Sequence, residues 1–332
     1  MTAFNGCMRV LFCLVLAVAV VPVSAGSAAP GGETGVEAVR ERLAELRRER
    51  GVYDPALIEA WSDLAAQQAD NGDHEQAADS WHEALQISRI SDGLYDTSQL
   101  RIIEQLAMAY EEAGETEEAD TYHYLLFHTR SRLHAPDSPE SVDAVIDWGD
   151  WKLRRSTARN GNLNPGALSG AELESLWSQQ ADAMEVLRSW QDDSGRVPDD
   201  VRFGSLLYLR AVTELGMAIL VLQRPAHLFD PPLTQQYVTQ RVCRNVSDPS
   251  GGTRQECSTR QVENPQYRRA QVAERSQQAE RAIRAARQTL SELTEWQGNA
   301  PEEAVKSDEL ETLNRALTRL EQNARRSRFR RW

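Results

Sequence analysis

Apolar side chains recur along most of the chain at intervals of three and four residues. The first such stretch carries Val36, Val39, Leu43 and Leu46, and Gly51 follows it. This spacing places the apolar side chains on one face of a helix, and a glycine just beyond it commonly ends a helix. No stretch shows a convincing alternation of apolar and polar residues with a period of two. We therefore predict an all-α fold.

The next four predicted helices form two pairs, and a turn of two residues that contains glycine joins the members of each pair. The predicted ranges are 55–70 with 73–89, and 98–113 with 116–133. Because the turns are so short, the two helices of each pair are expected to run antiparallel as a helical hairpin.

The two hairpins repeat one another with a period of 42 residues. In the first, the repeated positions are Trp61, Leu64, Ala65, Gln68, Gly72, Ala77, Trp81 and Ala84. In the second, they are Ile103, Leu106, Ala107, Tyr110, Gly114, Ala119, His123 and Leu126. One further step of 42 residues leads to Val145, Trp148 and Gly149, which again place two large residues before a small one. The pattern therefore predicts the first helix of a third repeat at 139–155.

This pattern of large residues, small residues and glycine resembles the tetratricopeptide repeat (TPR) family. Small residues such as Ala65, Ala107 and Gly149 let neighbouring helices approach closely, and large ones such as Trp61 and Trp81 fill the remaining space. The common TPR period is about 34 residues. The longer period resembles the lengthened repeats of kinesin light chains, with the additional residues in the connections between hairpins. The resemblance implies a helical-hairpin solenoid.

The repeat register is lost after Arg155. The segment 156–169 is rich in Asn and Gly and is predicted as a loop inserted into the third hairpin, whose second helix is predicted at 171–190. The repeats therefore occupy 55–190, after an N-terminal linker and helix at 26–54. In the C-terminal region 191–324, helices are predicted at 199–223, 267–296 and 301–325, with an irregular segment at 225–265. These helices are expected to continue or cap the solenoid.

Charge divides the chain into two unlike halves. The total of 37 Lys and Arg against 50 Asp and Glu gives a net charge of -13. Residues 26–150 hold 27 acidic and 9 basic side chains, whereas 151–332 hold 23 acidic and 27 basic ones. A general nucleic-acid binder needs a basic surface, so this function class is excluded.

The first 25 residues are typical of a secretory signal peptide. Arg9 precedes an apolar run at 10–21, and Pro22 and the small residues up to Ala25 follow it. The run is shorter than the roughly 20 apolar residues of a membrane span. We expect cleavage and export to the periplasm or medium, with an uncleaved anchor as the alternative. No later transmembrane helix is predicted, since Arg210 and Glu214 interrupt the most apolar stretch.

Signal cleavage would leave two cysteines, Cys243 and Cys257. In an exported chain, two cysteines 14 positions apart are read as one disulfide. The residues between them are rich in Asn, Ser, Pro and Gly, so the sequence predicts a stapled surface loop. A redox-active pair is not favoured because the spacing is not CxxC.

Candidate catalytic and metal-binding groups are sparse. His123, His128 and His134 are spaced five and six apart, which does not stack them on one helical face as a metal pair requires. His123 occupies a repeat position normally filled by a core aromatic residue. There is no nucleophile-elbow, phosphate-loop or dinucleotide motif. We therefore expect no metal, no cofactor and no enzymatic activity.

The resemblance implies a partner-binding groove lined by the first helix of each hairpin. The positions that match the family's groove, apart from Ser62, Ala66 and Ile146, are Glu59, Asp70, Arg101, Glu104, Met108, Glu111, Glu112, Asp143 and Asp150. Ser62 and Ala66 stand where some TPRs use Lys and Asn to bind a peptide carboxylate, so that activity is not expected. The acidic lining predicts a basic or amine-bearing partner segment; the alternative is that the acids only keep the solenoid soluble.

The C-terminus is rich in arginine and aromatic residues. It consists of Arg325, Arg326, Ser327, Arg328, Phe329, Arg330, Arg331 and Trp332. Such a tail predicts contact with anionic lipid headgroups, or self-association with the acidic repeats of another copy. A frayed, solvated helix end is the third interpretation. The sequence thus favours an exported protein-interaction scaffold, with a lipid-associated envelope protein as the alternative.

Overall fold

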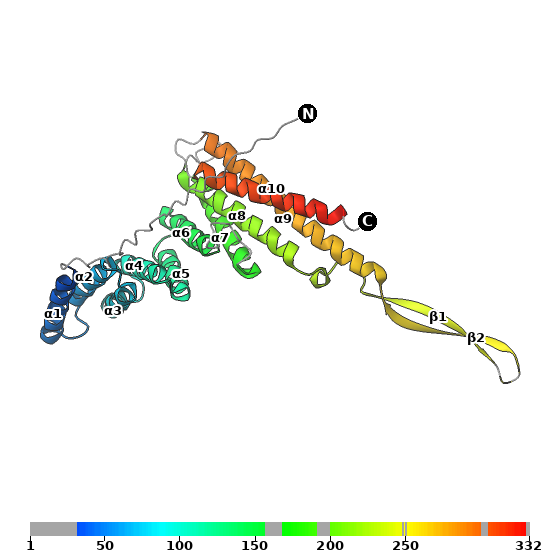
Figure 1. The fold of residues 1–332 in the computed structure, drawn as a ribbon, viewed down its shortest axis with the longest axis horizontal. Helices are drawn as coiled ribbons and strands as arrows, with labels where there is room; N and C mark the ends of the chain where they lie inside the picture. Colours follow the sequence, from blue (N-terminus) through cyan, green and yellow to red (C-terminus); the bar gives the residue numbers. More distant parts are fainter. Residues whose placement is uncertain are drawn as a thin grey trace, which may run out of the picture.

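The structure is a computed structural model that describes residues 32–156, 168–190, 200–247, 249, 251–299 and 305–329. Within these ranges helices dominate, and a single two-stranded sheet projects from one end of the molecule (Figure 1). The predicted signal peptide at 1–25 lies outside the described residues, and so do Arg330, Arg331 and Trp332.

The N-terminal half is a row of helices that follow one another in short hairpins (Figure 1). They are α1 (Gly32–Arg50), α2 (Ala56–Asp70), α3 (His74–Asp92), α4 (Thr97–Ala113), α5 (Thr116–Leu133) and α6 (Pro139–Arg155). The predicted hairpins α2–α3 and α4–α5 are confirmed. Gly72 and Gly114 adopt φ values of +84° and +81°. Because other residues adopt this left-handed backbone at a cost, glycine recurs at both turns.

Small residues sit at the helix crossings, as the repeat pattern predicts. Ala65 and Ala77 are fully buried in the first hairpin, and Ala107 and Ala119 are fully buried in the second. Leu64 and Leu106, the large residues beside them, are also buried. The close approach of helices at alanine and the filling of adjacent space by leucine account for the two repeats.

The third repeat differs from the first two in its packing, because its first helix, α6, contacts α8 (Val201–Gln223) as well as its hairpin partner α7 (Gly170–Ser189). Helix α7 completes the third hairpin, and the C-terminal helices are α8, α9 (Pro265–Asn299) and α10 (Ser307–Phe329). A Cβ atom added to Gly149 of α6 would lie 3.2 Å from Leu209 of α8. The glycine predicted from the repeat thus admits α8 beside the third repeat.

Helix α8 is the core helix of the C-terminal half. Its residues Phe203, Leu206, Leu207 and Leu215 are almost fully buried among α6, α7 and α9. By length and composition alone it could also cross a membrane. Its apolar side chains here face neighbouring helices, and the predicted helix ends agree with the structure to within two residues.

A buried carboxylate joins α8 to two neighbouring helices. Glu214 accepts hydrogen bonds from the Trp177 indole of α7 at 3.1 Å and the Thr289 hydroxyl of α9 at 2.8 Å. It also pairs with Arg210 of α8, whose Nε lies 3.2 Å from its Oε1. Only 5% of the Glu214 side chain is exposed. These contacts satisfy a charge that would otherwise be costly to bury.

The fold is mainly helical, as the predicted all-α class requires, but the segment 225–265, predicted as irregular throughout, contains two strands. Strands β1 (Tyr237–Ser247) and β2 (Thr253–Glu263) pair antiparallel. Cys243 and Cys257 lie directly opposite one another, with Cα atoms 4.0 Å apart, and form the predicted disulfide. The expected loop between the cysteines is therefore mostly strand. The sequence of the two strands lacks a regular alternation of apolar and polar residues because water reaches both faces of this ribbon.

Two further predictions concern the start of the last helix and the loop inserted into the third hairpin. Helix α10 begins at Ser307 rather than at residue 301, and Pro301 to Ala304 lie outside the described residues. Most of the predicted loop at 156–169 also lies outside them. At its far end Ser169 and Glu172 form a capping box that starts α7, so the second helix of the third hairpin begins at Gly170.

Candidate functional site

The first helices of the three hairpins present one exposed face each, and we call this surface the first-helix face. Seven of the predicted groove residues lie exposed on it: Glu59, Asp70, Arg101, Glu104, Met108, Glu112 and Asp150. Met108 is 50% exposed and adds an apolar side chain to this mainly acidic surface. No ion pair among the described residues engages Glu104 or Glu112.

Glu111, in contrast, is occupied by contacts inside the protein. Its carboxylate lies 2.6 Å from His123 Nε2 of α5 and 3.1 Å from Arg154 Nη1 of α6. The His123 ring stacks on Trp151 with ring centroids 4.2 Å apart. Burial lowers the pKa of His123, although hydrogen bonding to Glu111 opposes this effect. These contacts fasten α4, α5 and α6 together, and His123 takes the aromatic core position that the repeat assigned to it.

The acids of the third repeat are also engaged. Asp143 of α6 accepts two hydrogen bonds from the guanidinium of Arg202 in α8, at 2.6 and 3.1 Å. This bidentate pair raises the pKa of Arg202. Asp150 lies 2.8 Å from Arg154 on its own helix. Of the predicted groove acids, those on α6 therefore contribute less free charge than those on α2 and α4.

A buried lysine completes the junction between the second and third hairpins. Lys152 of α6 is 6% exposed and lies 3.1 Å from both Asp120 of α5 and Glu172 of α7. Burial raises the pKa of Asp120, but hydrogen bonds from Lys152 and Trp151 outweigh it and hold that pKa below its usual range. The network joins α5, α6 and α7 at the place where the second hairpin meets the third.

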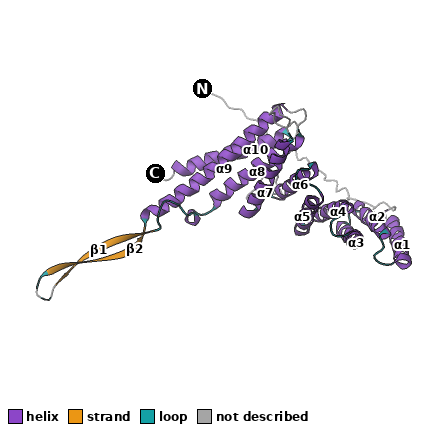
Figure 2. Ribbon diagram, turned by 180° about the vertical axis from the view of Figure 1, so that it is seen from behind, coloured by secondary structure: helices purple, strands orange, loops and turns teal. Residues whose placement is uncertain are grey.

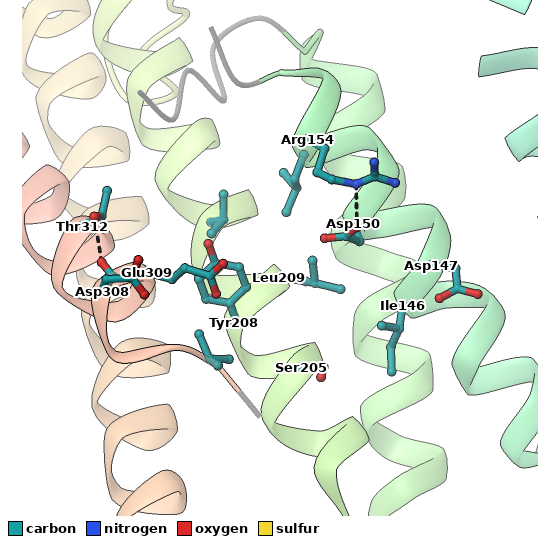
Figure 3. A pocket seen from close by; sticks show the side chains of 13 residues that line it. Ile146, Asp147, Asp150, Arg154, Ser205, Tyr208, Leu209, Asp308, Glu309 and Thr312 are labelled. Carbon is teal, nitrogen blue, oxygen red and sulfur yellow. Dashed lines mark hydrogen bonds and ion pairs between the residues drawn. The ribbon is translucent and has the colours of Figure 1, made fainter. Parts of the chain in front are cut away.

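The first-helix face continues into a cleft between α6, α8 and α10 with a volume of about 530 Å³ (Figure 3). Its α6 wall includes Ile146, Asp150 and Arg154, which stand 42 residues after Glu104, Met108 and Glu112 in the repeat. The cleft is lined by Ile146, Asp147, Asp150, Leu153, Arg154, Ser205, Tyr208, Leu209, Val212, Val305, Asp308, Glu309 and Thr312. The same repeat positions therefore form the open surface in α4 and the cleft wall in α6.

The cleft combines an apolar floor with an acidic rim. Leu153 and Val305 are buried, whereas Asp308 and Glu309 of the first turn of α10 are exposed. Burial and these two carboxylates, together with Asp150, raise the pKa of Tyr208 to about 12. Tyr208, like an ordinary tyrosine, is protonated at neutral pH and can donate a hydrogen bond into the cleft. The cleft suits a segment with both apolar and cationic groups.

Of the cleft residues, the sequence predicted Ile146 and Asp150 and missed the others, among them Tyr208, Asp308 and Glu309. These last three lie in helices outside the repeat, and only the packing of α8 and α10 against α6 brings them to the first-helix face. A local signal was present, since acidic residues in a first helical turn favour a helix start there. That signal does not select Ser307, because Glu302 and Glu303 after Pro301 give the same signal at residue 301, and it says nothing of the neighbours of α10.

Within the described part of the chain, no group of three or more His, Cys, Asp or Glu side chains is arranged to hold a metal ion. The predicted tail is described only in part: Arg325 and Arg326 are exposed, and Arg328 and Phe329 belong to the last turn of α10. Contact of this tail with lipid or with another copy stays a prediction.

The fold is a TPR-like array of helical hairpins extended by four long C-terminal elements, namely α8, the β-hairpin, α9 and α10. No family model and no curated protein matches the chain. Among solved structures, it is similar to the nearly identical TPR-like repeats of a protein described as a kinesin light chain from Podosopora anserina. That likeness has 12% identity and a TM-score of 0.41, over 56% of this chain and 78% of that one. BtubC (BKLC) from P. vanneervenii is also similar, with 12% identity and a TM-score of 0.34 over 82% and 92% of the two chains.

Proposed function

We propose that this protein is an exported, non-enzymatic scaffold whose first-helix face and cleft bind a partner segment bearing basic and apolar side chains. The observation that carries the proposal is the continuity of an acidic, partly apolar surface from α4 into the α6/α8/α10 cleft. A helical array presents such a surface to an extended partner without needing a deep pocket.

Charge supports a cationic partner. Glu104 and Glu112 have no ion pair among the described residues, and neither do Asp308 and Glu309 at the cleft rim. Unneutralised carboxylates on one surface attract cations over several ångströms and accelerate encounter with them. Met108 adds an exposed apolar contact, so the partner segment should alternate basic and apolar side chains.

Export is supported by two features of the chain. The first 25 residues follow the signal-peptide pattern, and Cys243 and Cys257 form a disulfide, which persists in oxidising compartments. Fractionation of cells that produce the protein with a C-terminal epitope tests this part. Mature protein that begins at Gly26 in the periplasm or medium is expected, and full-length protein in the cytoplasm would contradict it.

The binding surface is tested by crosslinking in intact cells. A photoreactive residue at Met108 or Ser205 is expected to capture a partner, whereas one at the exposed Gln86 of α3 is the matched control position. Replacing Glu104, Glu112 and Glu309 by Gln should reduce capture, because the cationic segment loses its counter-charges. Replacing Glu75, Glu117 and Glu118 on the second helices removes the same charge and should leave capture unchanged. Equal loss in both variants would refute a specific groove.

A further inference from the structure

The β-hairpin formed by β1 and β2, which we call the arm, precedes α9 in the chain. It projects beyond the N-terminal end of α9 and away from the repeats (Figures 1 and 2). Its strands are 11 residues long, which corresponds to roughly 35 Å. An isolated two-stranded ribbon is marginally stable in water. The disulfide between Cys243 and Cys257 joins the strands directly and offsets that weakness.

The two faces of the arm differ in chemistry. Val238, Val242, Val246 and Val262 lie on one face, since alternate residues of a strand share a face and Val238 pairs with Val262. These four valines are only half-buried, and almost every other residue of the strands is exposed. No other element among the described residues covers them.

The same face is basic. It carries Arg244, Arg254 and Arg260 but a single acid, Glu256. Glu256 is shared, because its carboxylate lies 3.5 Å from Arg244 and 2.6 Å from Arg254. Arg260 has no ion pair among the described residues. This Val/Arg face therefore combines exposed apolar surface with net positive charge.

We infer that the Val/Arg face of the arm docks on the first-helix face and cleft of a second copy of this chain. The inference rests on the proposed binding surface and names one occupant for it. The arm supplies alternating valine and arginine, and the surface supplies Met108 and Ile146 among the carboxylates of Glu104, Glu112 and Glu309. Both charge and apolar area are complementary.

The contact must join two molecules. The cleft lies beside the first half of α8, from Ser205 to Val212, whereas the arm follows the opposite end of α8, beyond Gln223. Figure 1 shows the arm pointing away from the repeats, so it cannot fold back onto its own first-helix face. Since the two surfaces differ, the contact is heterologous, and copies either exchange arms in a closed ring or form an open chain.

Light scattering on the purified mature chain after gel filtration tests the inference. At about 20 mM salt a mass of at least twice the monomer is expected, and at about 0.5 M salt the monomer should predominate, because salt screens charges on exposed surfaces. A mass that stays monomeric at low salt and high protein concentration would overturn it.

Charge reversal makes the test specific. The arm variant Arg244→Glu, Arg254→Glu, Arg260→Glu and the surface variant Glu104→Lys, Glu112→Lys, Glu309→Lys should each remain monomeric at low salt. Each variant then carries the same charge sign on its arm and on its first-helix face. An equal mixture of the two should regain the wild-type mass, because each arm now meets an opposite charge. Circular dichroism and an intact disulfide by mass spectrometry confirm that both variants are folded.

Three further outcomes would overturn the inference: a mixture that stays monomeric, an arm variant that still assembles, or arm-dependent sedimentation with vesicles of about 30% anionic lipid that the surface variant does not change. The same experiments distinguish a failure of this inference from a failure of the proposed function. If crosslinking at Met108 captures other proteins while the chain remains monomeric, the binding surface is retained and only the second-copy inference is lost.

Discussion

The repeat half and the C-terminal half differ in the buried groups at their helix contacts. In the repeats, alanines such as Ala65 and Ala107 lie at the helix crossings, and aliphatic side chains fill the space around them. In the C-terminal half, long helices pack on the apolar core around α8 and also enclose a buried charge, Glu214, which contacts α7 and α9. The junction between the halves also depends on a buried charge, Lys152.

This difference affects how strictly each kind of contact selects the helix that packs against it. At a small residue, any helix with a complementary ridge of side chains can approach closely. Successive repeats can therefore stack by the same packing geometry. A buried carboxylate accepts only a helix that brings the right donor to the right place. We therefore expect substitutions of buried charges to have larger effects than substitutions at helix crossings.

The largest effect is expected for Glu214→Ala. The change leaves Arg210, Trp177 and Thr289 without their acceptor, and removing one partner of a buried pair costs about 3 to 5 kcal/mol. Urea unfolding followed by circular dichroism measures the loss. The control is Glu311→Ala, since Glu311 is 71% exposed in its pair with Arg315 and should cost less than about 1 kcal/mol. Similar losses in both variants would contradict the comparison.

Lys152→Met is expected to cost about 2 to 3 kcal/mol, somewhat less than Glu214→Ala. It leaves Glu172 without its cation and Asp120 with Arg155 alone, 2.8 Å away, and these carboxylates are 37% and 26% exposed, so water partly compensates them. Thermal unfolding compared with that of Lys306→Met, an exposed lysine, isolates the effect of burial. A separate early transition for the C-terminal half would show that the junction has opened.

Gly149→Val tests the helix crossing and is expected to cost about 1 to 3 kcal/mol. Its side chain would push against Leu209, since even a Cβ atom lies only 3.2 Å from that residue. Gly298→Val is the control, because nothing lies within 4 Å of a Cβ atom there. If Gly149→Val unfolds no more easily than the control, α8 does not depend on this close approach.

The smallest effect is a pH dependence that arises from His123. Burial lowers its pKa in the folded state, so the unfolded chain binds the proton first as the pH falls. The contribution of neutral His123 is therefore present above the ordinary histidine pKa of about 6.5 and is lost as the pH falls below it. Melting temperatures between about pH 7.5 and 5.5 should decline less in His123→Gln than in the wild type. An equal decline would exclude His123 as the source.

Much of the repeat half could be predicted from the sequence. The 42-residue period, the glycines at the turns and the alanines at the crossings depend on residues close together in the chain, so the bounds of α2 to α6 follow from local pattern. The arm could not be predicted in the same way. Its valines recur every four residues, which is also a helical interval, and water on both faces removes the alternation that identifies a strand.

The candidate site shows the same limit within a single helix. Glu104 and Glu111 are the same residue type on one helix, and the sequence assigns both to the groove. His123 of α5 and Arg154 of α6 approach Glu111 and take up its charge, whereas Glu104 stays in water. The difference depends on the distance between helices, which side-chain packing sets.

By itself, the sequence determined the helical hairpins, their period, the cysteine pair and the unequal charge of the two halves, because each depends on spacing or on a count. Only the tertiary structure decided which acids remain free and that α6, α8 and α10 enclose a cleft. It also placed the valines and arginines of the arm on one exposed face. The reason is physical: a charge is neutralised or left free by the groups within a few ångströms of it, and in this fold those groups come from distant parts of the chain.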